Sequence, residues 1–352
     1  MIARPTMTAA SRRRTGTLLT AGAAAVLILL AGSRHSPILQ RRAALGTTTV
    51  PVLERATPLV IFSTIALGGF RGILADLLWL RTAVLQEDGR YFEIVQLADW
   101  ITRLQPQMTG IWTYQAWNMA FNISAMMPTP EGKWRWVRNG YALLRDSGIR
   151  HHPTDPLMYI ELGWLFQSKI GGRIDPAERH YRRWWAEEMD ALIGTPDGRL
   201  APALDDPARV RRLRDEYRLV PEYVRTIDDL YGPLDWRLPE THAVYWAWRG
   251  NAVTPEGADL RAMRMIYQCM TQLFFAGVYP EAAAWDREQA LPDLRLLPGV
   301  IRAFEEAMDR TPAPGVEAAY KVFLRNAAAL MREIGNVQSA QRLDQLLQER
   351  FE

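Results

Sequence analysis

The chain has 352 residues, a formal net charge of +3 at pH 7, five histidines and one cysteine. One cysteine excludes an intrachain disulfide, and the absence of an HExxH motif or a glycine-rich phosphate loop predicts no metal site and no cofactor. Residues 1–55 carry eight arginines and one glutamate, a net +7, which leaves −4 on the rest of the chain. This mildly acidic body argues against nucleic acid as the main partner.

An uncharged run of 19 residues, TGTLLTAGAAAVLILLAGS, directly follows three arginines that end a short basic tail at residues 1–14. A helix of that length spans about 28 Å, close to the hydrocarbon thickness of a bilayer. We expect residues 15–33 to be a transmembrane anchor, and a cleaved signal peptide is the alternative because only Ala21–Ala31 is strongly apolar. Four arginines precede the run and three follow it closely, which favours a single-pass protein with its body outside the cytoplasm.

Residues 34–58 contain Pro37, Pro51 and Pro58 and are predicted to be an irregular stalk. From Leu59 onward apolar residues recur every three or four positions, so the fold class is predicted to be all-α. We expect one helical lobe at 59–193, a linker loop at 194–205 and a second lobe at 206–352. The expected helices cover residues 64–87, 90–105, 109–126, 133–149, 156–170, 176–193, 207–231, 240–249, 255–277, 298–309, 316–334 and 337–351.

Capping residues set the expected helix boundaries. Four pairs place a side-chain cap before a proline at the first helical position: Asp155-Pro156, Asp175-Pro176, Asp206-Pro207 and Thr254-Pro255. Helix ends are predicted at Gly89, Gly148, Gly171 and Gly194, and a tight turn is predicted at Gly335-Asn336. These boundaries group the first six helices into antiparallel pairs, with a further pair at the C-terminus.

Two of these pairs end in LADWITRLQP and LLRDSGIRHHP, with proline just beyond the second helix, and the last pair contains AAALMREIGNVQSAQRLDQLL. In this respect the chain resembles bacterial membrane-anchored proteins built from tetratricopeptide-like repeats. The resemblance implies a solenoid of helix pairs that binds other proteins. The spacing of 47 residues between Pro106 and Pro153 departs from the usual 34.

Three amides, Gln115, Asn118 and Asn122, are spaced i, i+3 and i+7 on one side of the expected helix 109–126. An unpaired buried amide costs about 1–3 kcal/mol, so each amide needs a partner. Two interpretations stay open. The amides bond to neighbouring helices and fix their packing, or they line a concave surface that binds an extended peptide or a sugar.

The segment YGPLDWRLPETHAVYWAWRG at 231–250 holds Trp236 and His242 among carboxylates. Its aromatic rings either anchor a rigid turn to the body or line a carbohydrate cleft. A glycosidase would need two carboxyl groups about 5.5 Å or about 6.5–9.5 Å apart across a cleft. The candidates for such a pair are Asp228, Asp229, Asp235 and Glu240.

Four further side chains stand out. Trp134 and Trp136 alternate with arginines, and inter-helix packing or cation–π stacking is favoured over a nucleic-acid platform. Glu161 is the acid of an apolar helix and is expected to pair with an arginine or a buried amide. In addition, Cys269 is expected to be a buried, inert thiol.

The sequence therefore favours a non-enzymatic, membrane-tethered scaffold whose helical repeats bind a protein partner. Its candidate partner-binding residues are Gln115, Asn118, Asn122, Trp134, Trp136, Glu161, Trp236 and His242. A subunit of a membrane-associated complex is a related possibility. The alternative is a helical-toroid protein that binds or cleaves polysaccharide.

Overall fold

The computed structural model describes residues 70–172, 175–255, 257–277 and 292–351. The chain divides into two units between Gly68 and Gly69, and every described residue belongs to the second unit, Gly69–Glu352. The expected tail at 1–14, anchor at 15–33 and stalk at 34–58 lie outside the described residues. Within the described part, no helix combines the length and the apolar character needed to cross a bilayer.

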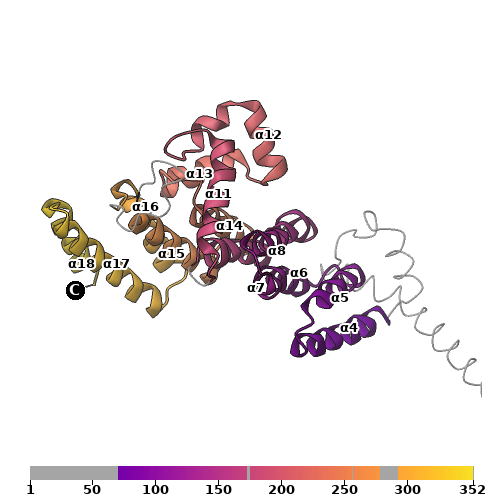
Figure 1. The fold of residues 1–352 in the computed structure, drawn as a ribbon. Helices are drawn as coiled ribbons and strands as arrows, with labels where there is room; N and C mark the ends of the chain where they lie inside the picture. Colours follow the sequence, from indigo (N-terminus) through magenta and orange to yellow (C-terminus); the bar gives the residue numbers. More distant parts are fainter. Residues whose placement is uncertain (1–69, 173–174, 256, 278–291, 352) are drawn as a thin grey trace, which may run out of the picture. The chain divides into compact units, whose positions relative to one another are not determined.

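The described residues form helices and connecting loops, with no strand among them, which confirms the all-α class (Figure 1). The first half contains α4 (Phe70–Glu87), α5 (Tyr91–Leu104), α6 (Thr109–Trp117), α7 (Ser124–Met126), α8 (Pro130–Ala142), α9 (Ile149–His151), α10 (Pro156–Trp164) and α11 (Glu178–Ile193). The second half contains α12 (Pro207–Glu216), α13 (Pro221–Tyr231), α14 (Pro239–Val253), α15 (Leu260–Ala276), α16 (Leu297–Arg310), α17 (Pro314–Glu333) and α18 (Val337–Phe351). Short 3₁₀ turns lie at η4 (Ala201–Asp205) and η6 (Leu294–Leu296).

Three consecutive helices contain a wider π-helical turn. The π-helical segments are η1 (Asn118–Ile123), η2 (Leu143–Gly148) and η3 (Leu165–Ile170). Segment η1 joins α6 to α7, η2 joins α8 to α9, and η3 continues α10. The expected helix end at Gly148 is therefore wrong, because the backbone stays helical through this residue as far as His151.

Side-chain caps that stand directly before a proline explain several of the helix starts. The Asp155 and Asp206 carboxylates accept the backbone N–H of Leu157 and Ala208 at 2.9 and 2.8 Å, as the sequence predicted. The expected start at Pro255 is wrong: α15 begins at Leu260, where the Asp259 side chain accepts two backbone N–H groups. Asp175 accepts the N–H of Ala177 at 2.9 Å, but α11 itself begins at Glu178.

The single helix expected at 207–231 is in fact two helices, α12 and α13. The chain leaves the helical conformation at Arg218, whose φ is +57°. It re-enters a helix at Pro221, which has no N–H to lose at the first helical position. The positive φ of Gly89, Gly194 and Gly335 agrees with the expected helix end or turn at each of these glycines.

Most helices pack against the next helix along the chain, from α4 through α8 to α10 and again from α14 to α18. Between these two runs, α10 packs chiefly on α14 rather than on α11, so α11–α13 form an insertion within the stack. The insertion contacts η3, α14 and α16. Within the expected pair of 156–170 with 176–193, the main contact is between α11 and η3.

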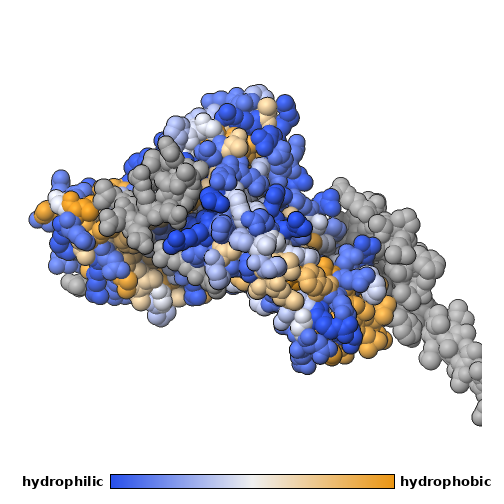
Figure 2. Space-filling view, in the orientation of Figure 1, coloured by the Kyte–Doolittle hydropathy of each residue, from blue (hydrophilic) through white to orange (hydrophobic). Residues whose placement is uncertain are grey.

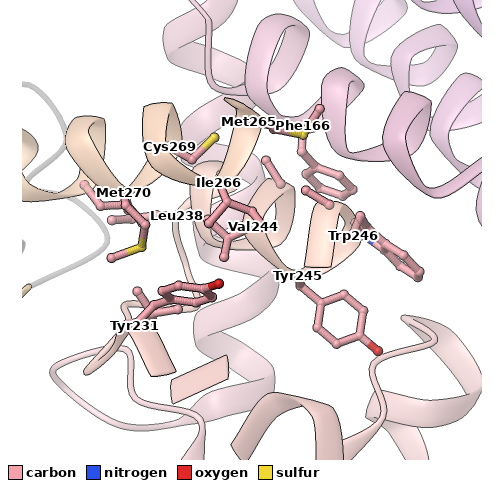
Figure 3. Packing of buried hydrophobic residues seen from close by; sticks show 14 of the residues in the cluster. Phe166, Tyr231, Leu238, Val244, Tyr245, Trp246, Met265, Ile266, Cys269 and Met270 are labelled. Atoms are coloured by element: carbon pink, nitrogen blue, oxygen red, sulfur yellow. The ribbon is translucent and has the colours of Figure 1, made fainter. Parts of the chain in front are cut away.

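One hydrophobic core extends from Trp112 of α6 to Leu343 of α18, and a second, smaller cluster joins α4 and α5 to the start of α6 through Ala75, Ala98, Ile101 and Ile111. Figure 3 shows the centre of the larger core, where Val244 and Trp246 of α14 lie near Met265 and Ile266 of α15. Residues of the expected linker 194–205 belong to the same core, because Leu200, Ala203 and Leu204 are buried in it. The core is thus continuous across the boundary expected between the two lobes.

Candidate functional site

A groove of about 600 Å³, open to solvent, lies over α8 and α11. Glu131 and Trp134 of α8 line one part, and Arg183, Trp184, Glu187 and Glu188 of α11 line the rest. Thr129 fixes the start of α8 by accepting the Gly132 N–H at 3.1 Å. The left-handed Gly194, with φ of +66°, ends α11.

Two tryptophans form the aromatic part of the groove. Trp134 is only 8% exposed and its ring stacks on that of Tyr181 at 5.6 Å. The Trp184 ring lies 6.2 Å from the Trp134 ring and 5.3 Å from the His180 ring, and it is only partly buried. A ligand would therefore meet the Trp184 ring first, with Trp134 as a fixed support.

Carboxylates surround these rings. Three glutamates and one arginine line the groove, which gives the lining a net charge of −2. Glu187 lies 3.7 Å from Arg183 in a pair that is about half exposed on each side. Glu188 is held more firmly, because its carboxylate accepts the Tyr217 hydroxyl at 3.0 Å and lies 3.8 Å from Arg138. Glu131 and Glu187 thus offer negative charge that faces solvent.

A buried charged cluster supports the groove from beneath. The Lys169 ammonium lies 2.5 Å from the Asp175 carboxylate, and both side chains are buried. The Tyr181 hydroxyl donates to the same carboxylate at 3.2 Å, and the Lys169 ammonium also lies 5.1 Å from the centre of the Phe121 ring. The Tyr181 ring on which Trp134 stacks is therefore fixed in position by the ion pair.

Burial acts on both members of this pair. It lowers the pKa of Lys169, although the hydrogen bond and charge of Asp175 oppose the change. Burial alone would raise the pKa of Asp175, but the hydrogen bonds from Lys169 and the Ala177 N–H, together with the lysine charge, hold it below its usual value. Lys169 and Asp175 therefore each favour the charged form of the other, an ammonium and a carboxylate.

A second ion pair attaches α11 to α14. The Arg182 guanidinium donates to the Glu240 carboxylate and to the carbonyl of Gly171, which follows η3. Glu240, one of the carboxylates considered for polysaccharide cleavage, is buried by this pairing. It does not line the groove.

The three amides predicted as a binding surface bond to α5 and to one another. Gln115 donates to the Val95 carbonyl at 3.4 Å, Asn118 donates to the Tyr91 carbonyl at 3.5 Å, and Asn122 donates to the Asn118 side chain at 3.0 Å. These contacts agree with the packing interpretation. The ligand-binding interpretation stays a prediction.

The other predicted site residues lie in different surroundings. Trp136 contacts the Phe92 ring at 5.6 Å, and Glu161 is partly buried, which raises its pKa against the effect of the nearby Arg261. Trp236 and His242 are buried and linked, since the His242 Nε2 lies 2.8 Å from the Trp236 carbonyl. Of the eight predicted residues, Trp134 alone lines the groove, and the eight do not form one cluster around it.

The remaining acidic candidates also have local partners. Asp228 accepts the Trp236 indole N–H at 3.2 Å and the Leu234 N–H at 3.2 Å, and Asp235 pairs with Arg237 at 2.7 Å. Asp229 is exposed on α13. A second hollow, lined in part by Asp197, Asp235 and Asp293, holds only about 10 Å³, which is room for one water molecule.

A repeated motif escaped the sequence predictions. Asp-x-Arg occurs in EDGR, PDGR, LDWR, ADLR and PDLR, each at or just before the start of a helical segment. In the last three copies the aspartate accepts the backbone N–H of the arginine two residues later and also pairs with its guanidinium. The repetition of the Asp-x-Arg pattern was the signal that could have revealed these loop contacts.

Within the described ranges, no group of three or more histidine, cysteine, aspartate or glutamate side chains is arranged to hold a metal ion. Cys269 is buried, as expected, and burial raises the pKa of its thiol. Comparison with protein-family models, with curated proteins and with solved structures gives no significant match. The tetratricopeptide-like resemblance therefore stays a prediction.

Proposed function

We propose that the protein is a membrane-tethered helical-repeat scaffold that holds a segment of a partner protein in the groove over α8 and α11. The observation that carries the proposal is the groove itself, which is lined by the partly buried Trp184 together with the exposed Glu131 and Glu187. Its open, shallow form leaves a bound molecule largely in solvent, whereas small-molecule sites bury most of their ligand. The groove therefore suits one side of a polypeptide segment better than a small-molecule substrate.

The lining also defines the chemistry of the partner. A net charge of −2 beside aromatic rings favours a segment that carries arginine or lysine next to an apolar side chain. The guanidinium or ammonium would lie near Glu131 and Glu187, and its stem would cover the Trp184 ring. Tryptophan and arginine are the residues that most often dominate such interfaces.

The packing order supports the repeat architecture within this proposal. Successive helices contact their neighbours along most of the described chain, as in a helical solenoid. The insertion α11–α13 interrupts the stack and supplies four of the six residues that line the groove. We infer that the chain departs from a regular tetratricopeptide-like array at the point where it binds its partner.

The tether and the location belong to the same proposal. The uncharged run at 15–33 and the arginines on both sides support a single-pass protein with an extracytoplasmic body. A membrane-associated partner, including the other subunits of a membrane complex, would share this compartment.

Affinity purification of the full chain from detergent extracts tests the proposal. The unmodified chain should recover a partner in stoichiometric amount. The double variant Glu131→Arg/Glu187→Arg should recover at least tenfold less of this partner, because it reverses the charge of the groove. Glu333→Arg/Glu349→Arg makes the same charge change at exposed positions of the C-terminal helices and should retain the partner. Equal recovery from both double variants would contradict binding in the groove.

Carbohydrate binding is the second candidate, because an open groove with a tryptophan and carboxylates also suits a sugar. It is less favoured, since Trp134 is almost fully covered and only Trp184 could stack on a sugar ring. Titration of the detergent-solubilised chain with a panel of soluble oligosaccharides separates the two candidates. Saturable binding that Trp184→Ala abolishes would favour this alternative.

A further inference from the structure

The first described helix, α4, exposes an aliphatic face. Ile73, Leu77, Leu80 and Val84 recur at i, i+4, i+7 and i+11, so they share one side of the helix. Each of these side chains is between 46% and 64% exposed. In Figure 2, hydrophobic residues gather over the part of the molecule that Figure 1 labels α4.

This face is separate from the side of α4 that packs in the protein. Ala75, Thr82 and Leu85 are the buried residues of the helix, and α4 packs on α5 through this side. Asp76, Ala83 and Glu87 border the aliphatic face along one edge, and Arg81 lies at its other edge. The aliphatic face therefore adds apolar surface that the described fold does not use. Such exposed surface marks an interaction site.

The sequence before α4 indicates what covers the face. No charged residue occurs between Arg55 and Arg71, a run of 15 residues that includes LVIFSTIALGG. The run is too short for a confident bilayer crossing, and it leads directly into a helix with one aliphatic face. An apolar segment followed by an amphipathic helix is typical of chains that lie in the plane of the membrane interface.

We propose that the aliphatic face of α4 lies in the interfacial region of a lipid bilayer, with the helix axis parallel to the membrane. The inference rests on the proposed tether, because an anchor at 15–33 leaves only residues 34–69 between the bilayer and α4. Four aliphatic side chains would enter the boundary of the acyl chains. Arg81, at the edge of the face, would extend its guanidinium toward the headgroups.

The chemistry of the face favours lipid over a second copy of the chain. All four central residues are aliphatic, whereas protein interfaces are enriched in aromatic residues and arginine at their centre. Trp79, a large aromatic side chain on another side of α4, contacts the Tyr114 ring at 5.2 Å and so belongs to the packing within the protein. Lipid requires no matching pattern of side chains and accepts such a face as it stands.

Site-specific labelling of the full chain in phosphatidylcholine vesicles tests the inference. Because Cys269 is buried, a single introduced cysteine can be labelled selectively with the environment-sensitive dye NBD. The test position is Leu77→Cys, with Leu80→Cys as a second variant should the first fold poorly. Ala83→Cys on the polar side of α4 and Val322→Cys, an exposed apolar position on α17, are the controls.

We expect the dye at positions 77 and 80 to shift to shorter wavelength and to lose most of its emission when phosphatidylcholine spin-labelled on its acyl chain is added. Aqueous iodide should quench the dye at positions 83 and 322 instead. Protection of position 77 from both quenchers would indicate a protein contact and would overturn the inference. Iodide quenching at position 77 in vesicles that carry the protein would also overturn it, while the tether would stand. Failure of the full chain to float with the vesicles would contradict the tether itself and the inference with it.

Discussion

At the scale of single residues, Trp236 connects the buried His242 to the partly buried Asp228, and the protonation of these two groups affects stability in opposite directions. Burial lowers the pKa of His242 to about 4. Burial also raises the pKa of Asp228 to about 6, although the hydrogen bonds from Trp236 and Leu234 oppose the change. The charged form of each group is therefore disfavoured in the folded protein.

The signs follow from linkage. The unfolded state binds a proton at His242 below a pH of about 6.5, so the stability contribution of neutral His242 is lost as the pH falls from about 6.5 to about 4. Asp228 is favoured in its neutral form, so its contribution is present at a pH below about 3.8 and is lost as the pH rises through about 6. The two effects largely cancel between pH 4 and 6.

Replacing one of the two groups should reveal the pH dependence that the other group contributes to stability. Relative to the unmodified chain, Asp228→Asn should gain stability as the pH rises from about 4 to 6, by an amount on the order of 3 kcal/mol. His242→Gln should show the reverse trend between about 4 and 6.5. Urea unfolding of both variants across this range gives the comparison, with the exposed Asp215→Asn on α12 as the matched control. Parallel pH profiles for all four proteins would contradict the assignment.

The buried ion pair beneath the groove makes a second prediction at this scale. Lys169→Met leaves the Asp175 carboxylate buried without its cation and should lower the free energy of unfolding by about 3–5 kcal/mol. The double variant Lys169→Met/Asp175→Asn removes both charges, keeps an oxygen to accept the Ala177 N–H, and should recover most of the loss. Denaturant unfolding of Lys169→Met, Asp175→Asn and the double variant measures the coupling energy between the two side chains. A double variant as unstable as the sum of the two single variants would show that the two groups act independently.

At the scale of elements, the loop between α11 and η4 depends on Gly198. Its φ is +70°, and a Cβ atom there would overlap the Asp235 carboxylate. The Gly198 carbonyl also accepts the Trp236 N–H at 2.9 Å, so the loop and the segment before α14 pack backbone to backbone. Only glycine allows this approach.

A matched pair of glycines separates backbone strain from overlap. Gly89 has the same φ of +70°, and a Cβ atom added there would meet nothing within 4 Å. Gly89→Ala should therefore cost only the left-handed strain of about 1–2 kcal/mol. Gly198→Ala adds the overlap and should cost about 2–5 kcal/mol. Thermal unfolding of the two variants distinguishes the two contributions, and equal losses would show that the loop moves away from Asp235 freely.

Local chemistry decided which elements the sequence could predict. A left-handed glycine marks a helix end at Gly89 and at Gly194, and an aspartate cap marks a helix start at Asp155. Each of these signals depends on only a few adjacent residues, so the sequence alone predicts it. The break at Arg218 was missed even though Pro221 marks the start of a new helix. The π-helical turns were also missed, because periodicity alone does not distinguish them from α-helix.

The candidate site was less predictable than the helices. Trp134 was named, but Glu131 and Glu187 look like ordinary solvated residues on a helix surface. Their significance depends on α8 and α11 being brought together, and the two helices are separated in sequence by α9, α10 and η3. A pattern confined to one helix cannot reveal such a contact.

At the scale of the whole molecule, the insertion of α11–α13 between α10 and α14 is the feature that creates the groove. The helices on either side of it pack in chain order, and one core runs from α6 to α18. The contact between α10 and α14 skips more than 60 residues of sequence, and no local pattern predicts it. The proposed function therefore depends on a long-range arrangement and not on a motif.

Photo-crosslinking from the groove in native membranes tests the central claim most directly. The full chain would carry p-benzoylphenylalanine in place of Trp184, and in a control chain in place of the exposed Val322 of α17. We predict one major adduct with a membrane-associated protein from position 184, reduced at least tenfold by Glu131→Arg/Glu187→Arg and missing from position 322. The same adducts from both positions, or an adduct at 184 that survives the charge reversal, would contradict a partner held in this groove.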